Sequence, residues 1–298
     1  MKFTAALLIF TICVSFISTK EINNTKITVP PGTVQLKDSL YIDKYEVSNE
    51  MWHAYTDGWL IKVERDSDLY KTMQPDSNVW HSLRFEAEHY SAAYANSYEF
   101  ANYPVLGISY EQAVAYCEWR TDRVNEFLAK NKDAAFKSVV YRLPTEKEWE
   151  LAASGKLNTT QYPYGYDKIR ERVRNDSTKM FNCYYSDIDS ALNTIQNNVL
   201  PIDWGKPNGY GIYNIIGNAG EMVAEKGLSK GGFYDLPVEY CKIKEQFSYT
   251  KPNRYLGFRC VCLIENKEVF KKPEGFKPSK PDKKEKPSKK TNAFQQNQ

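Results

Sequence analysis

The stretch KGGFYDLPVEYC at residues 230–241, with LGFRC at residues 256–260 close behind it, is the most informative part of this chain. It combines a glycine pair, closely spaced aromatic residues and two cysteines. Several other distinctive motifs precede it along the chain. They are PPGTV (30–34), LYIDKYEVSN (40–49), YPV (103–105), SYEQAVAYCEW (109–119), YRLPTEKEWE (141–150), YPYG (162–165) and NGYGIYNIIGNAGE (208–221). The sequence shows no internal repeat and no glycine-rich phosphate loop after a strand. The motifs predict one continuous domain.

In order and spacing, these motifs resemble those of the formylglycine-generating enzymes. Members of that family are copper-dependent oxidases that convert a sulfatase cysteine to formylglycine. The resemblance implies an α+β, loop-rich domain with the C-type-lectin-like fold over residues 20–265. Residues 103–126 also resemble the gliding-motility and type IX secretion proteins of bacterial envelopes.

The resemblance also shows where the copper chemistry is altered. In the family, the glycine pair is followed by a serine and then by two cysteines five residues apart that hold copper(I). Here Phe233 stands at the serine position and Leu236 at the first cysteine position, and only Cys241 is retained. Copper(I) is a soft ion that favours paired thiolates, so Cys241 facing a leucine does not form the same site. Gly220 further replaces a tryptophan that the family often carries in its cleft.

We therefore expect copper to be absent and the chain to be a non-catalytic binding or scaffold protein. Two alternatives remain open at this stage. One is an active oxidase in which Cys183 or Cys262 replaces the missing copper ligand beside Cys241. The other is a lectin-like carbohydrate binder that uses the aromatic cleft. His53, His81 and His89 are too few and too clustered for most histidine-based metal sites.

The family resemblance implies a disulfide between Cys117 and Cys260. This bond would close a loop of about 140 residues and contribute roughly 4–5 kcal/mol on the chain-entropy model. Cys183 and Cys241 are one option for a second bridge, which would leave Cys262 unpaired. The sequence does not decide that pairing.

A calcium site is the second metal feature that the resemblance implies. In the family, one calcium ion is held by an asparagine, two backbone carbonyl groups and a glutamate. The same spacing here gives Asn214, Gly217, Ala219 and Glu221. Hard oxygen ligands on a tight loop suit Ca²⁺.

The two ends of the chain predict export and a charged extension. Residues 1–19 are typical of a signal peptide, with Lys2 before the apolar run at residues 5–17. Cys13 raises a lipoprotein alternative, which Ile12 before it disfavours because lipid attachment normally needs a small residue there. Residues 266–298 hold ten lysines against four acidic residues and predict a disordered tail. We expect a periplasmic, cell-envelope or secreted protein whose partners are envelope or secreted proteins, with a tail that can contact an acidic surface.

Local patterns predict the secondary structure that carries the motifs. Residues 40–47 alternate as a strand, and Ser48 or Asn49 then caps a helix. Ser109 with Gln112 and Thr145 with Glu148 form capping boxes that open two further helices, the second of which ends at Gly155. Residues 56–103 and 156–201 lack periodicity and are expected to be irregular loops.

Overall fold

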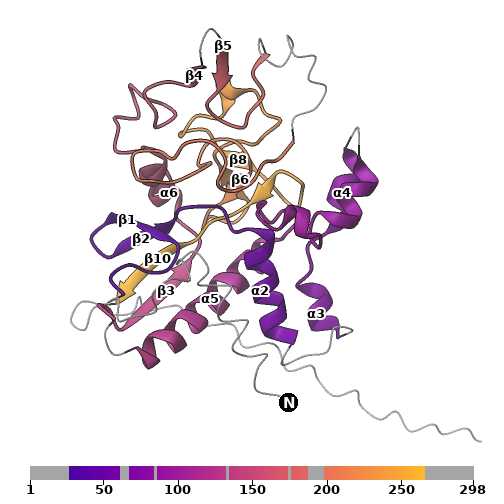
Figure 1. The fold of residues 1–298 in the computed structure, drawn as a ribbon, viewed down its shortest axis with the longest axis vertical. Helices are drawn as coiled ribbons and strands as arrows, with labels where there is room; N and C mark the ends of the chain where they lie inside the picture. Colours follow the sequence, from indigo (N-terminus) through magenta and orange to yellow (C-terminus); the bar gives the residue numbers. More distant parts are fainter. Residues whose placement is uncertain are drawn as a thin grey trace, which may run out of the picture.

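The computed structural model describes residues 27–60, 67–83, 86–131, 134–173, 176–186 and 198–265. The predicted signal peptide and the lysine-rich tail lie outside these residues. Helices and strands mix along the described chain, so the predicted α+β class is confirmed (Figure 1). No helix in this described part is long and apolar enough to cross a membrane.

The first sheet joins distant parts of the chain. It is antiparallel, in the order β1-β2-β10-β3. The strands are β1 (Thr33–Lys37), β2 (Leu40–Asp43), β3 (Ser138–Arg142) and β10 (Val261–Glu265). Because β10 pairs with both β2 and β3, the end of the described chain holds its beginning and its middle together.

The second sheet carries the segment that opened the sequence analysis. Its order is β8-β7-β6-β9, and β6 pairs in parallel with β9. The strands are β6 (Gly220–Met222), β7 (Leu228–Lys230), β8 (Phe247–Ser248) and β9 (Leu256–Gly257). The glycine pair follows directly after β7, so this sheet fixes the start of the candidate site.

The capping signals place the three longest helices correctly. They are α2 (Asn49–Leu60), α5 (Tyr110–Lys130) and α6 (Glu146–Ala153). Both predicted capping boxes are present, and Gly155 adopts a positive φ just beyond the end of α6. Ser48 accepts a hydrogen bond from the Met51 amide and so caps α2. These caps satisfy amide groups that otherwise lack a partner at the start of a helix.

Helix α5 also protects the open edge of the first sheet. The Asn125 side chain accepts from the Val139 amide and donates to the Val139 carbonyl group. The Thr121 hydroxyl group accepts from the Tyr141 amide. These bonds satisfy the outer edge of β3, which would otherwise be available for pairing with another chain.

Three sequence expectations need correction. The strand predicted at residues 40–47 ends at Asp43, beyond which the backbone bonds to residues outside the sheet ladder. The loop predicted at 56–103 contains short helices with local caps, namely α3 (Asp68–Thr72), η1 (Ser77–Ser82), α4 (Ala87–Ala93) and η2 (Tyr98–Phe100). The loop predicted at 156–201 contains a hairpin of β4 (Arg170–Val173) and β5 (Asp176–Lys179). Elements this short lack a sustained apolar period, and the strand sequences RERV and DSTK have little apolar content to signal them.

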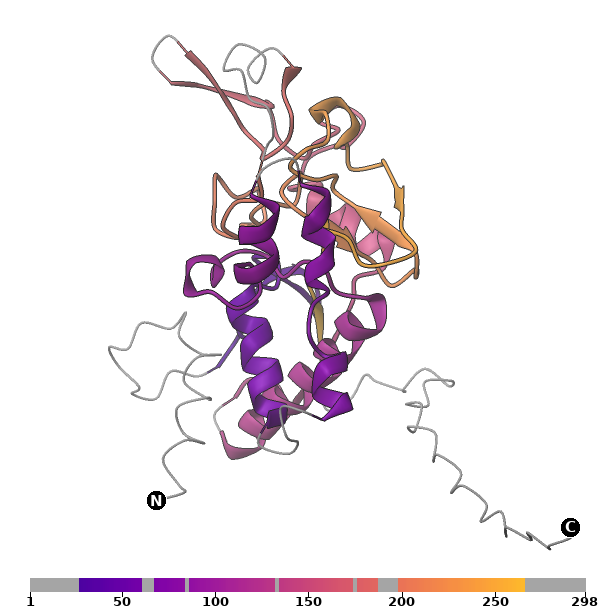
Figure 2. The ribbon, with the colours of Figure 1, turned by 90° about the vertical axis from the view of Figure 1, so that its right-hand side faces the viewer.

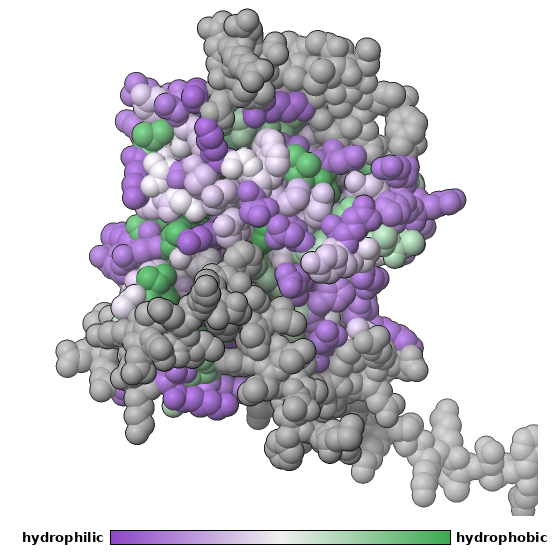
Figure 3. Space-filling model, in the orientation of Figure 1, coloured by the Kyte–Doolittle hydropathy of each residue, from purple (hydrophilic) through white to green (hydrophobic). Residues whose placement is uncertain are grey.

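The buried apolar side chains form separate clusters, and Cys241 belongs to one of them. One buried cluster joins α2 and α5 to the first sheet, and a second surrounds Trp149 of α6 and includes Cys183 and Cys241. The β4–β5 hairpin projects at one end of the molecule, away from α2 and α5 (Figure 2). On the face drawn in Figure 3, hydrophilic side chains prevail and hydrophobic ones are scattered in small groups.

Candidate functional site

The glycine pair after β7 brings the backbone close to its neighbours. Gly231 and Gly232 have φ values of +91° and +73°, a region that side chains rarely permit. A Cβ atom on Gly231 would lie 3.0 Å from the Ile215 carbonyl oxygen, and one on Gly232 would lie 2.4 Å from the Cys241 sulfur. The pair therefore folds the chain so that Cys241 packs directly beneath it.

Phe233 and Leu236 supply apolar side chains on the segment that leads to Cys241. The Phe233 ring stacks on Tyr255 with 4.2 Å between ring centroids, and it meets Phe247 edge-on. The Leu236 amide closes a turn onto the Phe233 carbonyl group, and the Leu236 side chain packs against the core cluster around Cys241. These residues offer ring and aliphatic surface where the copper site of the family requires a hydroxyl group and a thiol.

Gly220 borders the same region. It opens β6, and its amide donates to the Tyr255 carbonyl group. A Cβ atom there would lie 3.4 Å from the carbonyl oxygens of Gly232 and Tyr255, which is an ordinary contact. Gly220 therefore lies close to Gly232, the glycine that packs against Cys241.

Cys241 has a sulfur neighbour, which is Cys183. The two sulfur atoms lie 3.3 Å apart, and both residues are 0% exposed. Burial, and then the adjoining Cys241 thiol, raise the pKa of Cys183 well above its usual value. Cys262 is buried in the other core cluster, where burial raises its pKa to about 12. The structure thus favours Cys183 over Cys262 as the partner of Cys241.

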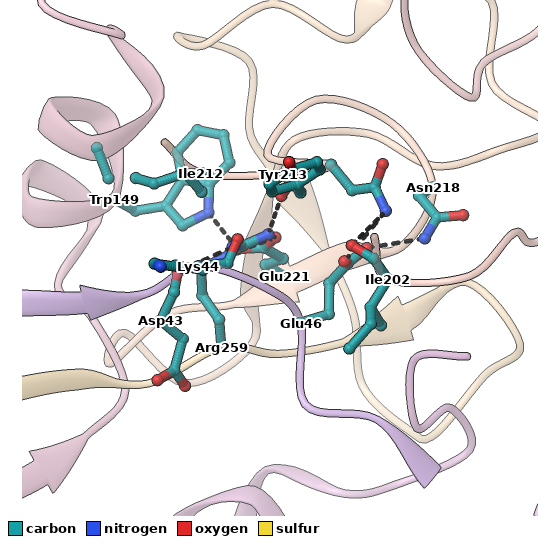
Figure 4. Close-up of polar contacts among 12 residues, drawn as sticks. Asp43, Lys44, Glu46, Trp149, Ile202, Ile212, Tyr213, Asn218, Glu221 and Arg259 are labelled. Atoms are coloured by element: carbon teal, nitrogen blue, oxygen red, sulfur yellow. Dashed lines mark hydrogen bonds and ion pairs between the residues drawn. The ribbon is translucent and has the colours of Figure 1, made fainter. Parts of the chain in front are cut away.

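A buried ion pair lies at the centre of the domain (Figure 4). The Arg259 guanidinium group donates to both Glu221 carboxylate oxygens at 2.6–2.8 Å, and both side chains are 0% exposed. Trp149 also donates to Glu221, at 2.7 Å. The remaining Arg259 hydrogens reach the carbonyl groups of Asp43, Lys44 and Tyr213. Burial alone would lower the pKa of Arg259, but its carboxylate neighbours, Glu221 first among them, together raise it.

Glu46 is a second fully buried carboxyl group close to this ion pair. It accepts hydrogen bonds from the side chains of Asn218, at 2.8 Å, and Asn214, at 3.4 Å. Burial, opposed in part by the charge of Arg259, raises the pKa of Glu46 to about 8. Glu46 therefore binds a proton in the folded protein over a pH range in which it is ionised in the unfolded chain.

Stability is expected to depend on this proton. The pKa of Glu46 is higher in the folded state, so the folded state binds more protons between about pH 4.5 and 8, and stability falls as the pH rises through that window. Between about pH 5.5 and 7.5 the loss should be about 2 kcal/mol. Chemical denaturation of wild type and Glu46→Gln at both pH values measures it. The wild type should lose stability relative to the variant as the pH rises, and a constant difference between the two would contradict the assignment.

Two of the four predicted calcium ligands, Asn214 and Glu221, have partners within the protein. The Asn214 amide donates to the carbonyl groups of Pro201 and Ile202, both at 3.1 Å. Glu221, the one charged ligand of the predicted set, is already neutralised by Arg259. The residues present thus do not fit a calcium ion held by Asn214, Gly217, Ala219 and Glu221. Calcium stays a prediction that this geometry does not support.

The cysteines of the predicted structural disulfide are adjacent. Cys117 lies on α5 and Cys260 immediately precedes β10, with 3.4 Å between their sulfur atoms. Both residues are buried. The fold therefore brings the two sulfur atoms within reach of bond formation after a small adjustment.

Comparison with known proteins establishes the family. A family model described as "Sulfatase-modifying factor enzyme 1-like domain" matches residues 14–264. The chain belongs to this family. The formylglycine-generating enzyme of Mus musculus is 26% identical over 275 residues, covering 76% of this chain and 66% of the mouse protein, slightly under two thirds of its length.

One further relative and one solved structure are also similar to this chain. The inactive Cα-formylglycine-generating enzyme 2 of Bos taurus is 30% identical over 129 residues, covering 43% of this chain and 35% of that protein. Among solved structures, Treponema denticola variable protein 1 aligns with a TM-score of 0.45 and 18% identity, over 80% of this chain and 93% of that protein. The chain is thus similar both to a protein named formylglycine-generating enzyme and to one named inactive.

Sequence reasoning missed the polar centre of the domain. Arg259 stands in the apolar stretch LGFRCVCLI, at residues 256–264, and Glu46 follows a strand. A charged residue within an apolar stretch indicates a buried pair, because an unpaired buried charge is costly. That signal pointed to Arg259, but the identity of its partner depends on the tertiary fold.

Proposed function

We propose that this chain is an exported member of the family that keeps the C-type-lectin-like fold and acts without catalysis, as a binding or scaffold protein of the cell envelope. The observation that carries the proposal is the environment of the Cys241 side chain. Leu236 stands where a copper-binding thiol is expected, and the Cys241 sulfur is fully buried against Cys183. A substrate cysteine has no path to a sulfur atom with no exposed surface. Similarity to a relative named inactive supports this proposal.

An oxidase that uses Cys183 in place of the missing ligand is the second candidate. The 3.3 Å between the Cys183 and Cys241 sulfur atoms favours it, because two adjacent thiolates suit copper(I). Burial and the raised pKa of Cys183 oppose it, since both disfavour the thiolate that binds copper. The non-catalytic proposal is therefore preferred.

The partners are proposed from chemistry alone. The lysine-rich residues 266–298 suit an acidic surface of the envelope or of a secreted protein. The aromatic group of Phe233, Phe247 and Tyr255 is the surface that a carbohydrate ligand would use in the lectin-like alternative.

A copper titration tests the loss of the metal site. We expect the wild-type protein, titrated with copper(I) against a competing chelator, to show no tight uptake that depends on Cys241. The matched variant combines Leu236→Cys and Phe233→Ser with Cys183→Ala, which removes the sulfur neighbour of Cys241. This variant should bind one copper ion per chain. An active formylglycine-generating enzyme serves as positive control. Stoichiometric binding by the wild type that disappears in Cys241→Ala would contradict the proposal.

A further inference from the structure

Cys183 and Cys241 lie on two segments that are fixed to each other by their backbones. The Tyr184 amide donates to the Leu236 carbonyl group at 3.0 Å, and the Val238 amide donates to the Tyr184 carbonyl group at 2.9 Å. Tyr184 and Pro237 form a β-bridge. Each cysteine is within a few residues of this bridge, so the backbone holds the two residues close enough for their sulfur atoms to lie 3.3 Å apart.

Two glycines make room for the sulfur atoms. A Cβ atom on Gly217 would lie 2.5 Å from the Cys183 sulfur, and a Cβ atom on Gly232 would lie 2.4 Å from the Cys241 sulfur. Both distances are far below ordinary contact, and both glycines have positive φ, +77° and +73°. The sulfur pair therefore occupies space that any other residue at these two positions would deny it.

The surroundings of the two sulfur atoms are apolar and can accommodate a bond between them. The pair is enclosed by apolar side chains of the second core cluster, including Val238 and Ile243. A disulfide is an apolar group, as a buried free cysteine side chain also is, so this enclosure accommodates the bond at no cost in buried polar groups. Among the described cysteines, Cys117 and Cys260 form the other close pair, and Cys262 is left over.

We propose that Cys183 and Cys241 form a second, interior disulfide that fixes residues 236–241 onto residues 182–185 and removes Cys241 from thiol chemistry. The bond forms by exchange with a small-molecule or protein disulfide. One thiolate of the pair attacks that disulfide, the mixed disulfide is resolved by the other cysteine, and the carrier leaves as two thiols. Cys183 and Cys241 lose two electrons and two protons, and the carrier gains them. Because the folded protein buries both sulfur atoms, exchange takes place before these segments close.

Peptide mapping tests the bond directly. The full chain is refolded with a mixture of reduced and oxidised glutathione, alkylated in denaturant without reductant, digested and analysed by mass spectrometry. The expected result is a linked peptide pair that contains Cys183 and Cys241, with Cys262 alkylated. Alkylation of both Cys183 and Cys241, or a link from either to Cys262, overturns the proposal, whatever the state of Cys117 and Cys260.

Two variants sharpen the result. Cys183→Ala should leave Cys241 unpaired and so add one thiol to the count of the mature, denatured protein. Cys262→Ala is the matched control and should remove one thiol while keeping the linked pair. A thiol count that falls by one in Cys183→Ala also overturns the proposal, because it means that Cys183 is a free thiol in the wild type. The disulfide and the proposed function can be tested separately. Peptide mapping reports whether the two sulfur atoms are linked, whereas an assay of formylglycine formation reports whether the chain is catalytic.

Discussion

Replacing Arg259 by methionine is expected to lower the free energy of unfolding by about 3–5 kcal/mol, because the change leaves the Glu221 charge buried without its partner. The guanidinium group makes three hydrogen bonds to Glu221 and also reaches the carbonyl groups of Asp43, Lys44 and Tyr213. All of these acceptors would lose a donor that water cannot replace. Chemical denaturation followed by far-UV circular dichroism measures the loss.

Two controls separate the buried charge from general damage. The double variant Arg259→Met with Glu221→Met removes both charges and should recover part of the loss, because an apolar pair of similar volume no longer buries an unpaired ion. Lys226→Met breaks the exposed pair of Lys226 with Glu111, whose side chains are 66% and 64% exposed, and should change stability little because solvent screens exposed charges. A loss for Arg259→Met no larger than that for Lys226→Met would contradict the central role of the ion pair.

Reduction of the bond predicted between Cys117 and Cys260 is expected to lower the free energy of unfolding by roughly 4–5 kcal/mol. The two cysteines are 143 residues apart in sequence, so the bond restricts a long segment of the unfolded chain. The measurement compares unfolding with and without reductant in a background that carries Cys183→Ala and Cys241→Ala. In that background only the bond between Cys117 and Cys260 can respond to reductant.

Adding Cys117→Ala to the same background provides the control. This variant should have lower stability and no remaining response to reductant. If reductant leaves the background protein unchanged, Cys117 and Cys260 are thiols in the folded state and the predicted disulfide is absent.

Local signals in the sequence predict much of the fold, and long-range pairing accounts for what they miss. Ser109 and Thr145 correctly predict where α5 and α6 begin, because a helix cap needs only residues three positions away. The short helices of residues 67–100 escape prediction because they last one or two turns and show no repeated apolar spacing.

The candidate site likewise combines residues that local motifs reveal with contacts that only the tertiary fold determines. Gly220, Phe233 and Leu236 can be identified from their positions within motifs, and the structure packs Leu236 against the core cluster that contains Cys241. The pairing of Glu221 with Arg259 and the distance from Cys183 to Cys241 depend on how separate segments pack. The glycines that accommodate the sulfur pair have no local pattern that reveals their role, since only the packed structure shows what a Cβ atom would meet.

The most direct test of the account is formylglycine formation. Reduced protein loaded with copper(I) is incubated with a peptide of the sulfatase type, Cys-x-Pro-x-Arg, and the product is followed by mass spectrometry, with Cys241→Ala and an active formylglycine-generating enzyme as controls. Because Leu236 supplies no thiolate and Cys241 is buried beneath Gly232, the account predicts no formylglycine above the Cys241→Ala background. Formylglycine made by the wild type and lost in Cys241→Ala would show that the chain is an oxidase.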